Sequence, residues 1–437
     1  MKKIKIILII IVLGFLLLGT KLYLEHNAKP NIILITFDAL RADHLGFQGY
    51  PKNTSPFLDA LSKKSLTFTN CIAVSGTTVP AVSALFTSRF PYIDGAVTDQ
   101  YTLGENYITL AEFLKGKGYN TLAIPGHYYL KTKFGFSRGF DYFDDNYIEF
   151  RTADEILART IELFERKNNS GKFFLWIHFR EPHSPYNPPE EYIERLDLPA
   201  VPEISQKAEY TIYGKKRILT DKAVRELIAR YDGNIKFADS NLRKIFDYLQ
   251  KKNFFKKTIV IITADHGESL GEHNIFDHNK LYYGILHVPL IIKIPGGQGK
   301  VVNNSVSAID IFPTILDLLG YRKYISQLQL RGKSLLEESS SSDICFSEYP
   351  GVYSIIKENW RLYRDFSNNT KLLFDINTDP LEAQDLSDNH RDVYQTLNDQ
   401  LSGILGVKKD VTMDAIDKKA LLNKEDIMHL RSLGYIN

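Results

Sequence analysis

The sequence predicts an α/β fold in which helices cover both faces of a mostly parallel central sheet. Five short apolar runs, rich in β-branched and aromatic residues, have the length and composition of strands buried on both faces. Longer segments in which apolar residues recur at helical spacing lie between these runs. Strands that alternate with helices favour a mostly parallel sheet with a helical layer on each side.

The predicted strands are residues 31–37, 120–124, 172–177, 257–263 and 288–294. The predicted helices are residues 109–117, 153–167 and 221–251. Polar residues follow the first four strands, and among them are Asp38, His127, His183, Asp265 and His266. Because ligands of open parallel sheets bind outside the carboxyl ends of the strands, we expect one site to collect these side chains.

Three segments are expected along the chain. Residues 1–24 form a membrane segment, residues 25–335 form the main α/β domain, and residues 336–437 form a C-terminal subdomain. The subdomain begins with a serine-rich linker, and the short alternating segments after it predict a small antiparallel sheet and a terminal helix. The stretch 187–220 is proline-rich and then polar, and it is interpreted as a long loop over one edge.

The amino-terminal segment has the pattern of a membrane anchor. Lys2, Lys3 and Lys5 precede an uncharged run at residues 6–20, and Lys21 follows it. The run is short for a bilayer core, although Lys21 can snorkel. A cleaved signal peptide is the alternative, but no A-x-A-like cleavage site follows the run. We expect an uncleaved signal anchor that leaves the body of the chain outside the cytoplasm.

The composition excludes some classes of protein. The 437-residue chain has a net charge of +2 and no long basic run after its first residues, so nucleic acid is not an expected partner. The two cysteines, Cys71 and Cys345, have the spacing of neither a zinc ribbon nor a redox pair. We interpret them as buried thiols, and a disulfide between them stays open.

Carboxylate and imidazole groups follow two of the predicted strands. Asp38 comes directly after one strand, where an acid can also serve as a helix N-cap. Asp265 and His266 follow another, and Gly267 is expected to permit a sharp turn that lets both face one cation. Residues 265–278 hold three histidines and four acids, which is more than a solvated loop requires. This set predicts a site for zinc, manganese or a similar ion.

Thr78 stands at the start of another predicted helix. A hydroxyl there is commonly an N-cap. It is also a candidate nucleophile, because a helix N-terminus stabilises the negative charge of an alkoxide and of a bound anionic ester. The segment 180–186 carries His183 between two prolines, which hold its loop rigid. His178 lies inside an apolar strand and is interpreted as a core residue.

These pieces, in this order, resemble the sulfatase family of the alkaline phosphatase superfamily. The resemblance covers nearly all of the chain after Pro30. Residues 30–46 and 263–273 are similar to the two metal-binding segments of the family. Its further signatures are matched by residues 54–61, 308–320, 373–382 and 430–435. The resemblance implies an alkaline-phosphatase-like fold, with residues 25–335 as the catalytic domain.

The resemblance also implies roles for individual residues. It implies that Asp38, Asp265 and His266 bind a divalent metal ion that Thr78 also touches as the nucleophile. His183 matches a catalytic histidine near the leaving group or the ester oxygens.

Further residues are candidates for contact with the anionic group of the substrate. His278 stands where many sulfatases have a substrate-binding lysine, and Arg180 and Lys280 are the other candidates. For Lys280, a solvated surface position is equally open.

The departures from the family pattern concern the nucleophile. Sulfatases oxidise a Cys or Ser of a C/S-x-P-x-R motif to formylglycine, but this chain has Thr78 in place of that residue and Val82 in place of the arginine. The lysine–histidine pair expected after residues 120–124 is also missing. A threonine at this position is similar to that of the phosphodiesterases and phosphotransferases of the superfamily, which form a phospho-threonine intermediate.

These observations predict an extracytoplasmic, metal-dependent hydrolase or transferase of phosphoric or sulfuric esters. The expected ion is manganese, zinc or calcium, and one metal is favoured over two. The expected substrate is an anionic ester of a surface glycan, a lipid head group or a wall polymer. The alternatives are a sulfatase that works without formylglycine and a non-catalytic surface protein that binds an anionic glycan.

Overall fold

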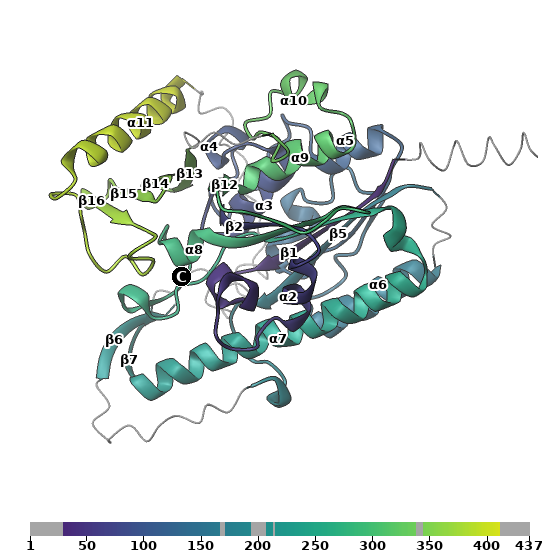
Figure 1. Ribbon diagram of the computed structural model, residues 1–437, viewed down its shortest axis with the longest axis horizontal. Coiled ribbons are helices and arrows are strands. Elements are labelled where there is room, and N and C mark those ends of the chain that lie inside the picture. The colour runs from purple at the N-terminus through teal and green to yellow at the C-terminus, as the bar shows by residue number, and fades with distance from the viewer. Residues whose placement is uncertain (1–28, 167–170, 194–206, 213–214, 338–343, 411–437) are drawn as a thin grey trace, which may run out of the picture.

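The computed structural model describes residues 29–166, 171–193, 207–212, 215–337 and 344–410. It confirms a mostly parallel central sheet with helices on both faces and a small C-terminal antiparallel sheet (Figure 1). None of the described helices is long and apolar enough to cross a membrane. The anchor predicted at residues 1–24 lies outside the described residues, and so does the family signature at 430–435.

Strand β1 lies between two parallel neighbours in the nine-stranded central sheet. The sheet follows the order β11-β2-β10-β8-β1-β5-β3-β4, and β12 pairs with β2. Ile33 of β1 lies opposite Leu175 of β5 and Val260 of β8, and all three side chains are buried. These parallel pairings bring the carboxyl ends of β1, β5 and β8 to one edge, where the polar residues follow.

The strands have the following bounds: β1 Asn31–Asp38, β2 Leu66–Ile72, β3 Asn120–Ile124, β4 Tyr142–Phe143, β5 Phe173–Pro182, β8 Thr258–Ala264, β10 His287–Lys293, β11 Lys300–Val302 and β12 Val306–Ser307. Strand β10 corresponds to the run predicted at residues 288–294, and it pairs antiparallel with both β8 and β2. Its carboxyl end therefore lies at the opposite edge from those of β1 and β8. An apolar run has no direction, so the sequence pattern could not predict this reversal.

Helices α2, α6 and α7 lie on one side of the central sheet, and α3, α5 and α9 lie on the other (Figure 1). The helices have the following bounds: α2 Pro56–Ser62, α3 Thr78–Thr87, α4 Pro91–Asp94, α5 Leu110–Gly116, α6 Ala153–Arg166, α7 Asp221–Lys251, α8 Tyr283–Leu286, α9 Ile311–Leu318, α10 Lys323–Gln327 and α11 Arg391–Asp410. The three predicted helices are present within a residue of the expected ends. Helix α7 buries an apolar stripe that includes Ile235, Leu242 and Leu249, as its spacing predicts.

The stretch 187–220 is not a continuous loop, as the sequence suggested. Residues Lys207–Ile212 form β6 and Lys215–Thr220 form β7, and β6 also pairs with β9 (Ile275–Phe276). Tyr210 and Ile212 alternate with more polar neighbours and pack against the main core. This period-two pattern indicates a strand, but the lysines around it hid the signal. Residues 194–206 lie outside the part of the chain that the structure describes.

The C-terminal sheet packs directly on the segment that leads into α3. Its antiparallel strands are β13 Cys345–Tyr349, β14 Val352–Lys357, β15 Trp360–Asp365 and β16 Thr370–Asp375. Ser347 Oγ donates to Ala73 O at 2.6 Å, and Glu348 N donates to Val74 O at 2.8 Å. These bonds fix β13 beside residues that come just before Thr78. Cys71 and Cys345 are buried free thiols, as interpreted from the sequence.

Candidate active site

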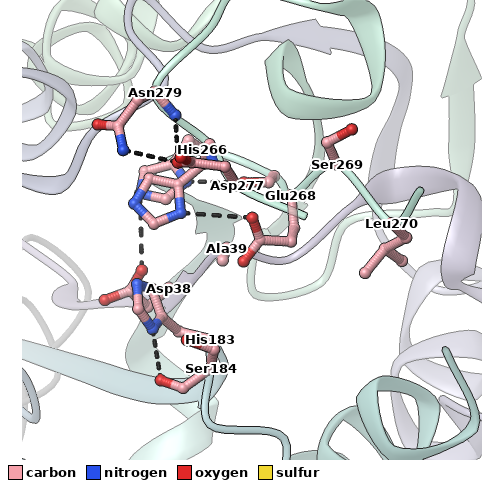
Figure 2. A network of polar contacts seen from close by, with 12 residues as sticks. Asp38, Ala39, His183, Ser184, His266, Glu268, Ser269, Leu270, Asp277 and Asn279 are labelled. Carbon is pink, nitrogen blue, oxygen red and sulfur yellow. Dashed lines mark hydrogen bonds and ion pairs between the residues drawn. The ribbon is translucent and has the colours of Figure 1, made fainter. Parts of the chain in front are cut away.

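Asp38, Asp265 and His266 meet at the carboxyl ends of β1 and β8. Asp38 is the last residue of β1, and Asp265 directly follows β8. Asp265 N donates to Phe37 O at 3.1 Å, which continues the pairing of the two strands by one residue. All three side chains are buried. Figure 2 shows Asp38 and His266 in one network with His183, Glu268 and Asp277.

The buried carboxylates of Asp38 and Asp265 lie close together and fit a cation-binding site. Oδ1 of Asp265 accepts from His266 N at 2.7 Å and from Ala39 N at 3.3 Å. Among the residues that the structure describes, its Oδ2 and both oxygens of Asp38 have no hydrogen-bond partner. Burial raises the pKa of Asp38 to about 6, although His266 and His278 act in the opposite direction. Burial and the charge of Asp38 raise the pKa of Asp265 well above its ordinary value. Two like charges without partners in a buried site fit the ligands of a positive ion.

His266 presents an unprotonated nitrogen to both carboxylates. Its Nδ1 lies 2.8 Å from Gly267 O, and because a carbonyl oxygen only accepts, Nδ1 carries the proton. Nε2 then lies 3.6 Å from Asp38 Oδ1, 3.8 Å from Asp265 Oδ2 and 3.5 Å from Thr78 Oγ1. Burial lowers the pKa of His266 to about 4, so the ring is neutral at pH 7. Carboxylate oxygens, a neutral imidazole and a hydroxyl form a donor set that suits a divalent ion.

His178 also belongs to this cluster, which the interpretation as a core residue did not anticipate. It is fully buried, but its Nε2 lies 3.5 Å from Asp38 Oδ2. Asp38, His178 and Asp265 each offer one ligand atom, and these atoms lie within 4.8 Å of one another. The Nδ1 of His178 lies 2.8 Å from Thr36 Oγ1, which also accepts from Trp176 Nε1 at 2.9 Å. When Nδ1 donates to Thr36, Nε2 is available to a metal ion.

Gly267 has a different role from the one expected. Its φ is not among the positive values of the chain, so a sharp left-handed turn is not the reason for a glycine here. A Cβ at Gly267 would lie 2.2 Å from Gly284 O. The residue therefore allows the loop after β8 to pack closely against the start of α8, and this contact holds His266 in place.

Thr78 is the first residue of α3, and its side chain is buried beside His266. The contact between Thr78 Oγ1 and His266 Nε2 places the hydroxyl against the acidic pair. The next amide, Val79 N, donates to Asp99 Oδ1 at 2.8 Å. Asp99 follows α4 in the chain, and no pattern in the sequence singled it out.

Gly76 allows two loops to approach each other beside Thr78. A Cβ at this position would lie 2.3 Å from His278 O and 2.4 Å from Lys280 O, and both atoms belong to backbone. The Gly76→Ala enzyme is therefore expected to lose roughly 100-fold in kcat/KM, because small displacements of reacting groups are costly. Gly116→Ala is the matched control, since a Cβ there meets no atom within 4 Å. Equal kcat/KM values for the two variants would contradict this role for Gly76.

His278 is a cation within the cluster. Burial alone would lower the pKa of His278, but Glu268, whose Oε1 lies 3.4 Å from Nδ1, raises it to about 10 together with Asp277 and Asp38. The ring of His278 lies 4.6 Å from that of His266 and 5.0 Å from that of His183, measured between centroids. A protonated imidazole at this place can donate to an anionic oxygen.

His183, His127 and Arg180 close the site on the side of β3 and β5. Nδ1 of His183 donates to Ser184 O at 2.7 Å, which makes Nε2 the unprotonated nitrogen of the neutral ring. His127 Nδ1 lies 3.7 Å from Asp38 Oδ2. Arg180 is buried, and its guanidinium stacks 4.0 Å from the ring of Phe150. Its Nε and Nη2 have no hydrogen-bond partner in the described part of the chain. Two buried donors that lack partners fit a site for an anionic group.

Lys280 is placed differently from the other candidates. It is half-buried, and its ammonium group acts electrostatically on Asp365 of the C-terminal sheet. No contact joins its side chain to the cluster within the described part of the chain. Of the site residues predicted from the sequence, the structure places all but Lys280 in one cluster: Asp38, Thr78, Arg180, His183, Asp265, His266 and His278.

Comparisons with known proteins give the family of the chain. A sequence profile described as Sulfatase matches residues 30–321, which is most of the chain. The chain belongs to the sulfatase family. A second profile, described as N-sulphoglucosamine sulphohydrolase, C-terminal, matches residues 271–407. The protein is therefore an enzyme of this hydrolase family, whose members typically use a divalent metal ion, rather than a non-catalytic binding protein.

Similar proteins include several enzymes that are named for sulfate esters. An arylsulfatase of Clostridium perfringens is 27% identical over 86% of this chain and 94% of its own length. An ulvan-active sulfatase of Formosa agariphila is 24% identical over 88% of this chain and 82% of its own. The fold is shared with the phosphonate monoester hydrolase of Agrobacterium radiobacter, at a TM-score of 0.70 and 20% identity over 91% of this chain and 99% of that one. It is also shared, at a TM-score of 0.70 and 18% identity over 89% of this chain and 100% of that one, with a protein solved in complex with its substrate D-glucosamine-2-N,6-O-disulfate.

Proposed function

We propose that this sulfatase-family enzyme is an extracytoplasmic hydrolase or transferase of phosphoric esters, with Thr78 as its nucleophile and a divalent ion as its cofactor. The observation that carries the proposal is the position of the Thr78 hydroxyl, 3.5 Å from His266 Nε2 at the start of α3. The hydroxyl lies beside carboxylate oxygens that lack hydrogen-bond partners within the described ranges of the chain.

Asp38, Asp265 and His266 would hold the metal ion, and Thr78 and His178 are within reach of the same place. A bound ion would lower the pKa of the Thr78 hydroxyl and neutralise charge on the ester oxygens. Its identity among manganese, zinc and calcium is left to measurement, and a single ion is sufficient for the proposal.

The proposed reaction has two displacement steps. In the first, Thr78 Oγ1 gives its proton to water and attacks phosphorus, and the bond from phosphorus to the leaving oxygen breaks. Protonated His278 donates a proton to that oxygen, with His183 beside it, while Arg180 binds a non-bridging oxygen. In the second step, water or an acceptor alcohol gives its proton to neutral His278 and attacks phosphorus. Thr78 Oγ1 then leaves and takes a proton back from water.

Phosphorus is preferred over sulfur because of the residue at position 78. The family's formylglycine arises from Cys or Ser, and threonine is neither. A hydroxyl that attacks phosphorus needs no such modification. Sulfate-ester hydrolysis is the second candidate, and it is favoured by the arylsulfatase and ulvan-active sulfatase names of the relatives. The substrate is proposed to be a surface glycan, a lipid head group or a wall polymer, reached by an enzyme anchored through residues 1–24.

The test compares three aryl esters under one set of conditions. The full-length enzyme in detergent, supplied with manganese or zinc, is assayed on an aryl phosphodiester, an aryl phosphomonoester and an aryl sulfate, with Thr78→Ala as the control. Cleavage of a phosphate ester that depends on Thr78 is expected. Cleavage of the sulfate alone, lost in Thr78→Ala, would reject phosphate chemistry and show that an unmodified hydroxyl supports sulfate transfer.

A further inference from the structure

Asp99 is an acidic residue that the proposed reaction does not use, although it lies beside the nucleophile. Its Oδ1 accepts from Val79 N at 2.8 Å, and Val79 directly follows Thr78 in the first turn of α3. A free amide in this turn would be a natural donor to an oxygen of a bound anion. In this chain, the amide of Val79 already binds a carboxylate of the protein.

The carboxylate of Asp99 also acts on the rest of the cluster. It interacts electrostatically with His278, His266 and Asp265, and it raises the pKa of Asp38 as a smaller effect after that of burial. Burial raises the pKa of Asp99 itself, while the hydrogen bond from Val79 and the two imidazoles act in the opposite direction. Asp99 has no ion pair with any lysine or arginine among the residues that the structure describes.

The balance of charge in the site decides what this residue does. The cluster holds the carboxyl groups of Asp38, Asp99, Asp265 and Glu268 and two cationic groups, the Arg180 guanidinium and protonated His278. A divalent ion would bring these groups close to neutrality and leave no surplus of positive charge. Arg180 and the ion can neutralise an ester with one negative charge. A second negative charge would be repelled by the carboxylate of Asp99.

We propose that Asp99 is a specificity-determining residue that restricts the site to esters with a single negative charge at the reacting group. The proposal rests on the proposed reaction at Thr78. Phosphodiesters, phosphonate monoesters and sulfate monoesters carry one negative charge at pH 8. Phosphomonoesters lose their second proton near pH 6 and carry nearly two. Asp99 thus separates these substrates by charge and not by the identity of the central atom.

The test compares the wild-type enzyme with Asp99→Asn at pH 8 in the presence of manganese. Asparagine keeps an oxygen that can accept from Val79 N but removes the negative charge. For an aryl phosphomonoester, kcat/KM is expected to rise about tenfold or more, because removal of one nearby repulsive charge has an effect of that order. For an aryl phosphodiester, kcat/KM is expected to change less than about threefold. A purely structural role would lower both values together, and that result would overturn the proposal.

A second measurement separates this proposal from the proposed phosphate chemistry. Inorganic phosphate is a competing dianion at pH 8, and its inhibition constant is measured against whichever aryl ester the enzyme cleaves, the sulfate included. Phosphate is expected to inhibit Asp99→Asn about tenfold more strongly than wild type. Asp388→Asn is the control, because this aspartate is exposed and lies outside the site. Equal inhibition of wild type and Asp99→Asn would reject the role of Asp99 even where phosphate esters are not substrates.

Discussion

The Thr78→Ala enzyme is expected to lose on the order of 10⁴-fold or more in kcat, because removal of a covalent nucleophile abolishes the two-step route. The hydroxyl lies beside His266 Nε2 and beside the oxygens of Asp38 and Asp265 that lack hydrogen-bond partners among the described residues. Within the same residues, no second hydroxyl contacts this nitrogen. Thr78→Ser keeps a hydroxyl at the start of α3 and is expected to retain measurable turnover.

Thr77→Ala is the matched control for this prediction. Thr77 precedes Thr78 on the same segment, and its hydroxyl is also buried, but it has no hydrogen-bond partner among the described residues. The measurement is kcat for the preferred aryl ester, with trapping of a phosphorylated protein in an acid quench as the second readout. If Thr78→Ala and Thr77→Ala lose equal activity, or if the trapped phosphate lies on another residue, Thr78 is not the nucleophile.

The sequence predicted those parts of the fold that depend on local pattern. The apolar runs at 31–37, 120–124 and 172–177 became β1, β3 and β5, and helix α7 has the predicted ends. The pattern could not provide strand direction, so the antiparallel pairing of β10 was unforeseen. Strands β6 and β7 were missed because polar side chains flank their apolar residues on a partly exposed hairpin.

The candidate site was predictable where a polar residue interrupts an apolar strand at its end. Asp38 and Asp265 stand out in this way, and the family resemblance added Thr78. His178 was missed because β5 continues to Pro182, beyond the point at which its apolar run seemed to end. The pairing of His178 with Thr36, two residues before Asp38, brings it to the acidic pair, and that pairing exists only in the folded sheet. Asp99 depends on the path of the chain after α4, for which the sequence offers no periodic signal.

Replacing Asp38 with asparagine is expected to weaken metal binding by about 100-fold or more and to abolish most of the activity, because a buried carboxylate is lost from the donor set. Asparagine has nearly the same shape, so the change removes charge and leaves the packing of β1 intact. The measurement is the metal concentration that restores activity after chelation, together with the metal content of the purified enzyme. Wild-type metal affinity in Asp38→Asn would exclude Asp38 as a ligand.

The same substitution should have the opposite effect on the metal-free protein. Burial raises the pKa of Asp38 to about 6, so ionisation of this carboxyl destabilises the folded state as pH rises from its unfolded value near 4 through 6. At pH 8, the free energy of unfolding of metal-free Asp38→Asn is therefore expected to exceed that of metal-free wild type by on the order of 1 kcal/mol or more. The measurement is the unfolding temperature, which should be higher for the variant. The difference should vanish below about pH 3, where Asp38 is protonated in both states. Added metal should reverse the order, since only wild type gains the binding free energy of the ion. A ligand role requires both signs, because a carboxylate that served only to support β1 would lower stability when replaced, with metal and without it.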